Sequence, residues 1–228
     1  TALNLFRQDY VKVLAASPRT ESLKKARIVV GTIDNPEIVA WAAEQGICLD
    51  RLQGKHEGFL LKVLGVGNKY RLAVLGSDKR GTAYGLMTLV RMMGVSPWQW
   101  WADCEPTPRE VFQLEADFER LEVPSVAYRG IFINDEDWGL NPWSSNNYEP
   151  KMRQRNGEDS TPRNGEIGPY THERIFELLL RLRANIFWPA MHECTVPFYL
   201  IKGNREVADK YGILISTSHC EPMMRNTN

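Results

Sequence analysis

The sequence has little that would mark a membrane, nucleic-acid-binding or disulfide-stabilised protein. None of its apolar runs approaches the roughly 18 consecutive residues of a membrane-spanning helix. Its 28 basic and 28 acidic side chains give a formal net charge of zero, which favours neither nucleic acid nor an anionic membrane surface as a partner. The four cysteines form no CxxC pair and no zinc-like spacing, so we expect free thiols, with a Cys194–Cys220 disulfide as the alternative. A signal peptide is also missing, and the chain begins at Thr1, which fits a processed or trimmed chain.

The second half of the sequence alternates strand-like and helix-like segments. Residues 128–134, 184–188 and 213–217 are short apolar runs of the kind that form buried strands. Residues 171–183 and 204–211 separate these runs and have helical character. This βαβαβ order predicts an α/β fold, and titratable residues follow each of the three runs. In a (β/α)-barrel, the C-terminal ends of the strands carry the chemistry.

The first half predicts a separate, small α+β domain. Its expected elements are helices over residues 5–16, 36–45 and 80–93, a strand over 27–32, and a hairpin of strands over 58–64 and 70–75. Residues 111–121 are typical of an extended connector, and the domain boundary is expected near Pro124. We therefore expect one domain over residues 1–123 and another over 124–228.

The second domain is too short for a complete barrel. A (β/α)8 barrel needs about 250 residues, whereas residues 124–228 suffice for three βα units. Three units alone would leave an open sheet edge, so we expect a truncated barrel and the N-terminal piece of a longer protein. Residues 139–170 are rich in Asn, Pro, Gly and Ser and predict a long loop after the first strand, either a mobile surface insertion or an active-site loop.

The strongest chemical signal is the acidic run Asn134-Asp135-Glu136-Asp137. On a strand, alternate side chains face opposite sides, which would place Asp135 and Asp137 on one side and Glu136 on the other. A carboxyl group in a crowded acidic cleft has a raised pKa, as a general acid requires. Glycoside hydrolysis uses one such group together with a second carboxylate. The alternative is a solvated acidic loop or a helix N-terminus.

Two clusters with His and Glu follow the next two strand-like runs. They are His192-Glu193 and His219-Cys220-Glu221. These residues could bind sugar hydroxyls and a carboxylate, or they could have a structural role. They could also ligate a metal, although HxH and HExxH spacings are missing. Trp138, Trp143 and Trp188 come near the same strand ends and suit an aromatic wall for a sugar ring, with barrel core as the alternative for Trp188.

Several longer motifs point to a known family. They are GSDKRGTAYGL at residues 76–86, GVSPWQWWAD at 94–103, YRGIFINDE at 128–136, LLLRLRAN at 178–185 with WPAM at 188–191, and TSHCEPMM at 217–224. In these stretches the chain resembles glycoside hydrolase family 115, the xylan α-1,2-glucuronidases. The resemblance implies a small N-terminal α+β domain like domain 2 of hexosaminidases, followed by a (β/α)8 TIM barrel. It also implies removal of glucuronic or 4-O-methylglucuronic acid from xylan, with inversion and with no metal or other cofactor.

The resemblance also implies roles for individual residues. By motif match, Asp135 and Glu136 would be the catalytic carboxyl groups of the pocket. Motif match and residue chemistry together give the expected substrate-binding residues Asn134, Asp137, Trp188, His192, Glu193, His219 and Glu221. The chain departs from the family pattern at Cys220, where a second His is common, and in the segment after Glu136. A different substrate preference could follow from these departures.

Our first expectation is therefore an inverting glycosidase whose partner is xylan or a xylo-oligosaccharide with uronic acid side chains. We expect neither nucleic acid nor membrane as a partner and a periplasmic or secreted location, and a homodimer through C-terminal domains missing from this chain stays open. The fragment alone should be inactive, because further catalytic groups would lie on later strands. The alternatives are a non-catalytic carbohydrate-binding fragment and a metal-dependent barrel hydrolase. The metal would be held by Asp135, His192, Glu193, His219 and Glu221.

Overall fold

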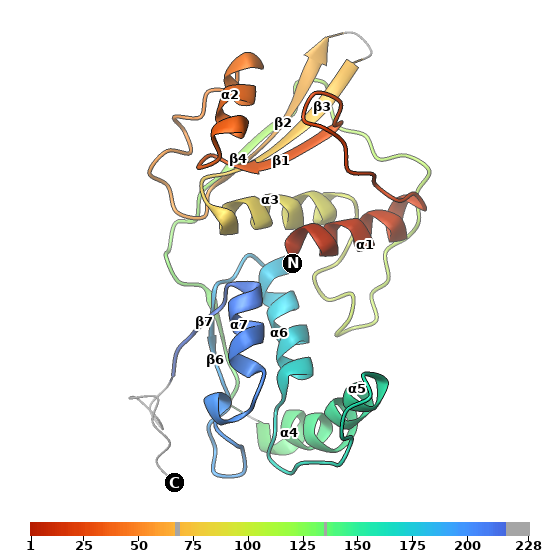
Figure 1. The fold of residues 1–228 in the computed structure, drawn as a ribbon, viewed down its shortest axis with the longest axis vertical. Helices are drawn as coiled ribbons and strands as arrows, with labels where there is room; N and C mark the ends of the chain where they lie inside the picture. Colours follow the sequence, from red (N-terminus) through yellow and green to blue (C-terminus); the bar gives the residue numbers. More distant parts are fainter. Residues whose placement is uncertain (67–68, 135, 218–228) are drawn as a thin grey trace. The chain divides into compact units, whose positions relative to one another are not determined.

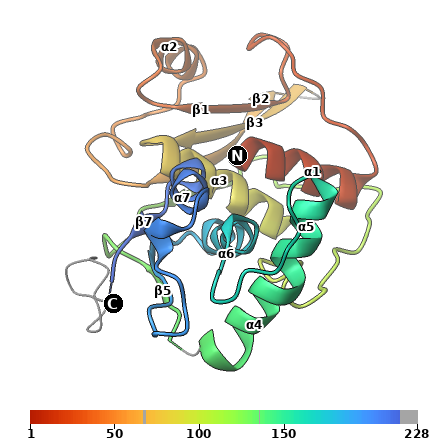
Figure 2. The same cartoon turned by 60° about the horizontal axis from the view of Figure 1, so that its bottom comes forward.

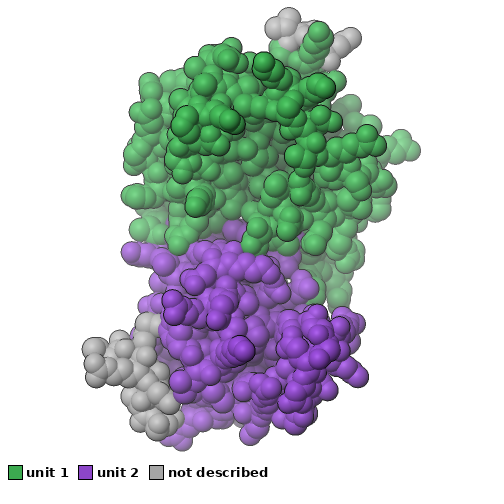
Figure 3. All heavy atoms as spheres, viewed as in Figure 1, with its two compact units in different colours: residues 1–127 green, residues 128–228 purple. Residues whose placement is uncertain are grey.

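The computed structural model describes residues 1–66, 69–134 and 136–217. The chain forms two compact units, Thr1–Ala127 (unit 1) and Tyr128–Asn228 (unit 2), which Figure 3 shows in green and purple. The sequence placed the domain boundary between residues 123 and 124. Within the described ranges, no helix has both the length and the apolar character that crossing a bilayer would require.

Unit 1 contains a four-stranded mixed sheet. Its strands are β1 (Ile28–Thr32), β2 (Phe59–Val66), β3 (Lys69–Gly76) and β4 (Glu119–Glu122), in the order β1-β3-β2-β4. β2 and β3 form the predicted antiparallel hairpin, and β1 pairs with β3 in parallel (Figure 1).

The strand β4 corrects one prediction for unit 1. Residues 111–121 were expected to be only a connector, but Glu119–Glu122 pairs with β2 as an edge strand. Its sequence, Glu-Arg-Leu-Glu, lacks the apolar alternation that announces a strand. The strand is held instead by its backbone ladder and by ion pairs of Glu119 with Arg51 and Lys62.

Helices cover both faces of this sheet. They are α1 (Ala2–Leu14), α2 (Pro36–Glu44) and α3 (Lys79–Met92). α2 begins where the Asn35 side chain accepts a hydrogen bond from the Glu37 amide, and the Asp78 side chain caps α3 in the same way. Figure 1 shows α2 on one face and α3 with α1 on the other.

Successive residues of β3 supply the two cores that these helices close. Ala73 and Leu75 belong to a buried cluster that includes Trp41 of α2. Val74 points the opposite way, toward Gly85 of α3, where an added Cβ would lie 3.0 Å from the valine side chain. Unit 1 is therefore a sheet between two helical layers, with an apolar core on each face.

Unit 2 contains three short parallel strands. They are β5 (Gly130–Phe132), β6 (Ile186–Trp188) and β7 (Leu214–Ile215), in the order β5-β6-β7. The helices α6 (Pro169–Arg181) and α7 (Asn204–Tyr211) connect them and lie side by side in Figures 1 and 2. The predicted mixed α/β character and the parallel βαβαβ order are confirmed, although each strand is shorter than predicted.

The segment after β5 corrects a second prediction. Residues 139–170 were expected to form a loop, but residues 136–155 are helical. The helical elements are η1 (Glu136–Leu140), α4 (Asn141–Trp143), η2 (Ser144–Tyr148) and α5 (Glu149–Arg155), where η1 and η2 have π-helical hydrogen bonding. Polar residues supply the buried side of this segment, so it shows no apolar periodicity in the sequence. Only residues 156–168, which follow α5, lack helix and strand.

Candidate functional site

The candidate site lies where the chain leaves the C-terminal ends of β5 and β6. Asp137 belongs to η1, which follows β5, and His192 lies in the loop that follows β6. The imidazole Nδ1 of His192 is 3.0 Å from Asp137 Oδ1. The thiol of Cys194 donates to the same carboxylate oxygen, with Sγ 2.9 Å away. The amide of Asn141 donates to the Cys194 carbonyl at 3.0 Å, which ties this loop to α4. We call these four residues the Asp137 cluster.

The hydrogen bonds of the Asp137 cluster set its charges. The bond from Cys194, followed by that from His192, holds the pKa of the Asp137 carboxyl below its ordinary value. Partial desolvation, followed by the hydrogen bond to Asp137, raises the pKa of the Cys194 thiol. Asp137 is therefore an ionised acceptor, and Cys194 is a neutral donor rather than a reactive thiolate. The expectation that crowding raises carboxyl pKa values is wrong for Asp137.

The acidic run also has a different geometry from the one predicted. β5 ends at Phe132, and a π-helix begins at Glu136. The backbone from Glu136 onward is therefore helical, and the alternation of side chains along a strand does not extend to Asp137. The sequence could not show that the strand ends at Phe132, because Ile133 prolongs the apolar run and the first polar residue is Asn134.

The three tryptophans named in the sequence lie in different surroundings, and the aromatic wall stays a prediction. Trp138 is 87% exposed, and Trp143 stacks on Tyr148 with ring centroids 4.8 Å apart. Trp188 ends β6 and packs against Phe132 at 5.8 Å. Trp188 thus lies at the C-terminal end of β6, whereas Trp143 belongs to the helical segment.

The remaining predicted residues divide into two groups. Asn134 and Glu193 are exposed, the first after β5 and the second between His192 and Cys194 of the Asp137 cluster. Asp135, His219 and Glu221 lie outside the described residues, as does Cys220 of the alternative disulfide. Cys48, Cys104 and Cys194 are free thiols. The predicted roles of all these residues stay predictions.

Sequence reasoning missed two members of the Asp137 cluster. Cys194 was expected to be a free thiol, with a disulfide as the alternative, and was given no role in the site, and Asn141 was assigned to a loop. The available signal was the position of Cys194 two residues after His192, directly past a strand end. Among residues 1–66, 69–134 and 136–217, no group of three or more His, Cys, Asp and Glu side chains is arranged to hold a metal ion.

A buried carboxyl group links the helical segment after β5 to α6. Glu149, at the start of α5, is fully buried, and its Oε1 accepts hydrogen bonds from the amide and hydroxyl of Thr171 at 2.6 and 2.8 Å. Thr171 lies in the first turn of α6, so Glu149 caps that helix from another element. Gly168 is required here because an added Cβ would lie 2.4 Å from the Glu149 carboxyl. Desolvation raises the pKa of Glu149, although the Thr171 hydrogen bonds oppose the shift.

Known families match both units of the chain. Residues 122–228 match the model of glycosyl hydrolase family 115, and residues 6–89 match that of the glycosyl hydrolase family 67 N-terminus. One similar solved structure is described as a family GH115 4-O-methyl-α-glucuronidase with specificity for decorated arabinogalactans. It shares 50% sequence identity and a TM-score of 0.86 over 98% of this chain.

The same match spans only 27% of the length of that solved chain. A second solved structure, CpGH84D, has 13% identity and a TM-score of 0.42, covering 95% of this chain and 38% of its own, and supports no statement about this chain. No curated protein matches the chain. The resemblance to family 115 that the motifs carry is confirmed.

Proposed function

Because the chain belongs to glycoside hydrolase family 115, we propose that it is part of an enzyme that removes glucuronic or 4-O-methylglucuronic acid side chains from a polysaccharide, with inversion. The observation that carries the proposal is the 50% identity to a 4-O-methyl-α-glucuronidase over nearly the whole chain. Since the chain spans about a quarter of that protein's length, the activity belongs to the complete protein.

In this proposal, β5, β6 and β7 are the first strands of a (β/α)8 barrel. Their parallel pairing in sequence order, with helices between them, is the arrangement that such a barrel repeats. Unit 1 takes the place of the hexosaminidase-like domain, which is supported by the match of residues 6–89 to another glycosidase N-terminus. The Asp137 cluster then lies at the catalytic end of the barrel, because it follows the C-terminal ends of β5 and β6.

In this proposal, Asp135 and Glu136 are the catalytic residues, and the residues around them bind the substrate. An ionised Asp137 is unsuited to act as the general acid, because it holds no proton at neutral pH. It suits the orientation of His192, whose second ring nitrogen can then contact sugar hydroxyls. The substrate-binding set is completed by Asn134, Trp188, Glu193, His219 and Glu221.

The proposed substrate is a uronate-decorated polysaccharide, either xylan or an arabinogalactan. The sequence pointed to xylan, while the similar solved enzyme is specific for decorated arabinogalactans. The departures from the family motif after Glu136 and at Cys220 are next to proposed site residues in the sequence and give a chemical reason for the preference to differ. A polymeric substrate of this kind also supports a periplasmic or secreted location.

The decisive experiment uses the complete protein. Glucuronoxylan and glucuronate-decorated arabinogalactan are incubated with it, released uronic acid is quantified, and the anomer formed first is identified by proton NMR. We expect uronic acid of inverted configuration, and we expect Asp135→Asn and Glu136→Gln to lower kcat by about 100-fold or more. Arg91→Gln, at an exposed residue of α3 in unit 1, serves as the control. If the complete protein releases uronic acid from neither polymer, the proposal is contradicted.

A further inference from the structure

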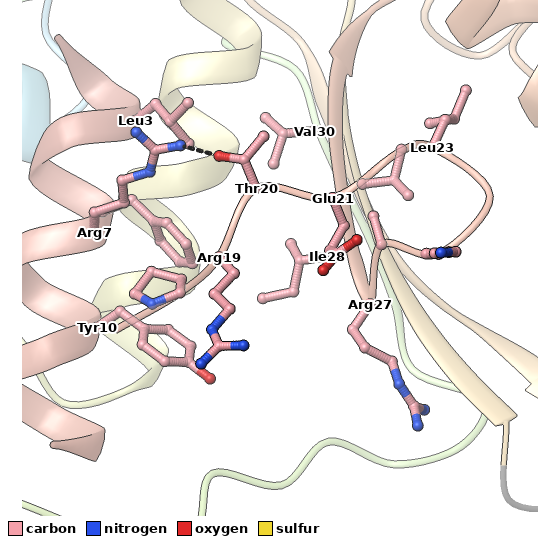
Figure 4. Close-up of a pocket in the computed structure, with 15 residues that line it drawn as sticks. Leu3, Arg7, Tyr10, Arg19, Thr20, Glu21, Leu23, Arg27, Ile28 and Val30 are labelled. Atoms are coloured by element: carbon pink, nitrogen blue, oxygen red, sulfur yellow. Dashed lines mark hydrogen bonds between the residues drawn. The ribbon is translucent and has the colours of Figure 1, made fainter. Parts of the chain in front are cut away.

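Unit 1 contains a pocket that the proposed active site does not use. It lies between α1 and the edge strand β1 and has a volume of about 420 Å³ (Figure 4). This volume falls within the range of roughly 300–1,000 Å³ that is typical of small-ligand sites. The chain between the two elements, from Pro18 to Arg27, lines the rest of the pocket.

One wall of the pocket is apolar and partly aromatic. α1 contributes Phe6 and Tyr10, whose ring centroids are 5.8 Å apart, and β1 contributes Ile28 and Val30. Figure 4 shows the Tyr10 ring from α1 opposite Ile28, with the space of the pocket between them. An aromatic ring beside aliphatic side chains offers a surface for the C–H face of a ring-shaped ligand.

The charges around the pocket are strongly unbalanced. Four cationic side chains line it, and Glu21 is the single acid among its lining residues. The cations are Arg7, Arg19, Lys25 and Arg27. Four positive charges against one negative charge leave a net charge of +3 at neutral pH. Such a pocket attracts an anion and disfavours a cation.

Two of these cations are held in place and two are available. Arg7 donates to the Thr20 hydroxyl at 2.8 Å, and Arg27 donates to the Tyr70 carbonyl at 3.1 Å. The side chains of Arg19 and Lys25 make no hydrogen bond or ion pair with the part of the chain that the structure describes. Arg19 and Tyr10 both line the pocket, so a free cation and an aromatic ring border the same space (Figure 4).

We propose that this pocket is a second carbohydrate site, separate from the Asp137 cluster, which binds a sugar acid through its carboxylate and its apolar face. Arg19 and Lys25 would bind the carboxylate, since an arginine fork matches its geometry, and Tyr10 would stack on the sugar ring. The anion requirement rests on the pocket alone, whereas the choice of a uronate rests on the proposed function. The uronate is either the free acid or a side chain of the polymer.

The proposal is tested by calorimetric titration of the 228-residue chain with sodium glucuronate, with glucose as the neutral match and with a glucuronate-decorated xylo-oligosaccharide. We expect glucuronate to bind, glucose to bind at least tenfold more weakly, and binding to weaken with added salt. Tighter binding of the oligosaccharide assigns the polymer as the source, and equal binding assigns the free acid. Glucose 6-phosphate is the competing anion, and a preference for it over glucuronate overturns the uronate assignment.

Three variants locate the binding. Arg19→Gln and Lys25→Gln should each weaken glucuronate binding about tenfold, because each removes a charge-assisted hydrogen bond. Arg91→Gln, at an exposed arginine of α3 outside the pocket lining, should leave binding unchanged. Circular dichroism confirms that each variant is folded. No glucuronate binding by the parent chain, or equal binding by Arg19→Gln, overturns the proposal.

The failure of this site is distinguishable from failure of the proposed function. In the complete protein, Arg19→Gln should leave kcat on a short aldouronic acid unchanged, since the pocket holds none of the proposed catalytic groups. Uronic acid release without glucuronate binding to the 228-residue chain overturns the pocket alone. Binding without release by the complete protein overturns the proposed hydrolase and leaves the pocket standing.

Discussion

Unit 1 and unit 2 differ in the kind of side chain that they bury. Among the described residues, unit 1 has four buried polar or charged side chains: Asp9, Glu57, Thr88 and Gln99. Unit 2 has twelve: Asn141, Ser144, Ser145, Glu149, Arg153, Thr171, His172, Glu177, Arg181, Asn185, Thr195 and Asn204. Buried polar groups cost free energy unless they are hydrogen-bonded. In unit 2, buried hydrogen bonds position loops and helix ends. Unit 1 is held together mainly by contacts between apolar side chains.

This comparison predicts that the largest loss of stability from a single substitution occurs in the apolar core of unit 1. Leu75 is fully buried between β3 and α2, so Leu75→Ala should lower the free energy of unfolding of unit 1 by about 4 kcal/mol. Amide hydrogen exchange followed by NMR reports the two units separately. The surface change Val39→Ala on α2 is the control and should have little effect. Equal losses for the two variants would break the comparison.

A second prediction concerns acid and the polar core of unit 2. His172 is buried among Phe176, Phe187 and Phe198, and its Nδ1 donates to the Gly168 carbonyl at 3.0 Å. Burial lowers the pKa of His172 from 6.5 to about 4. The unfolded chain therefore binds a proton between these pH values and the folded chain does not. Stability is fully present above pH 6.5 and falls as the pH approaches 4, by roughly 3 kcal/mol in total.

The measurement is amide exchange in unit 2 between pH 6.5 and 4.5, with unit 1 amides as the internal reference. His172→Gln should be less stable at pH 7 but should show a flatter dependence of stability on pH. A variant with the same pH dependence as the parent chain would remove His172 as the cause.

A third prediction separates the hydrogen bonds of Glu149 from its charge. Glu149→Ala leaves the buried amide and hydroxyl of Thr171 without their acceptor and should lower the stability of unit 2 by about 2 kcal/mol. Glu149→Gln keeps an acceptor. Because the pKa of Glu149 is raised, its contribution is fully present below the unfolded pKa and is lost as the pH rises. At pH 7 the Gln variant should therefore be at least as stable as the parent, and chemical denaturation tests this.

The smallest effect is expected on the surface, in the Asp137 cluster. Asp137 is 45% exposed, so Asp137→Asn should leave the stability of unit 2 unchanged. The pKa of the Cys194 thiol should fall, because the carboxylate that raises it becomes a neutral amide. Alkylation of Cys194 by iodoacetamide at pH 8 should then be several-fold faster, with the exposed Cys48 and Cys104 as references. An unchanged ratio of rates would show that the hydrogen bond does not control this thiol.

The two units also differ in how well their helices and strands can be predicted from the sequence. In unit 1, Asn35 and Pro36 mark the start of α2, and the glycine-rich turn between two apolar runs marks the hairpin. These signals are local, so the sequence alone is sufficient for these elements, whereas it did not reveal β4. In unit 2, residues 136–155 are helical because Ser144 and Glu149 contact Thr171 of a distant helix, and no periodic pattern in the segment announces such contacts.

The site was predictable in its position and not in its contacts. Strand ends with titratable residues correctly brought Asp137 and His192 to one place, since parallel strands end at the same edge. The bond from Cys194 depends on how the loop after β6 folds back toward η1, which residue spacing does not determine. The lowered pKa of Asp137 depends on that same bond.

The charged edge strand β4 has a consequence for how the protein behaves at high concentration. The outer strand of an open sheet can recruit a strand from another molecule, which leads to aggregation. β4 is only four residues long, and Glu119, Arg120 and Glu122 are engaged in ion pairs along it. An incoming strand would have to bring apolar side chains next to these charged ones while gaining very few backbone hydrogen bonds. The segment that the sequence suggested was a mere connector thus also shields this edge of the sheet from self-association.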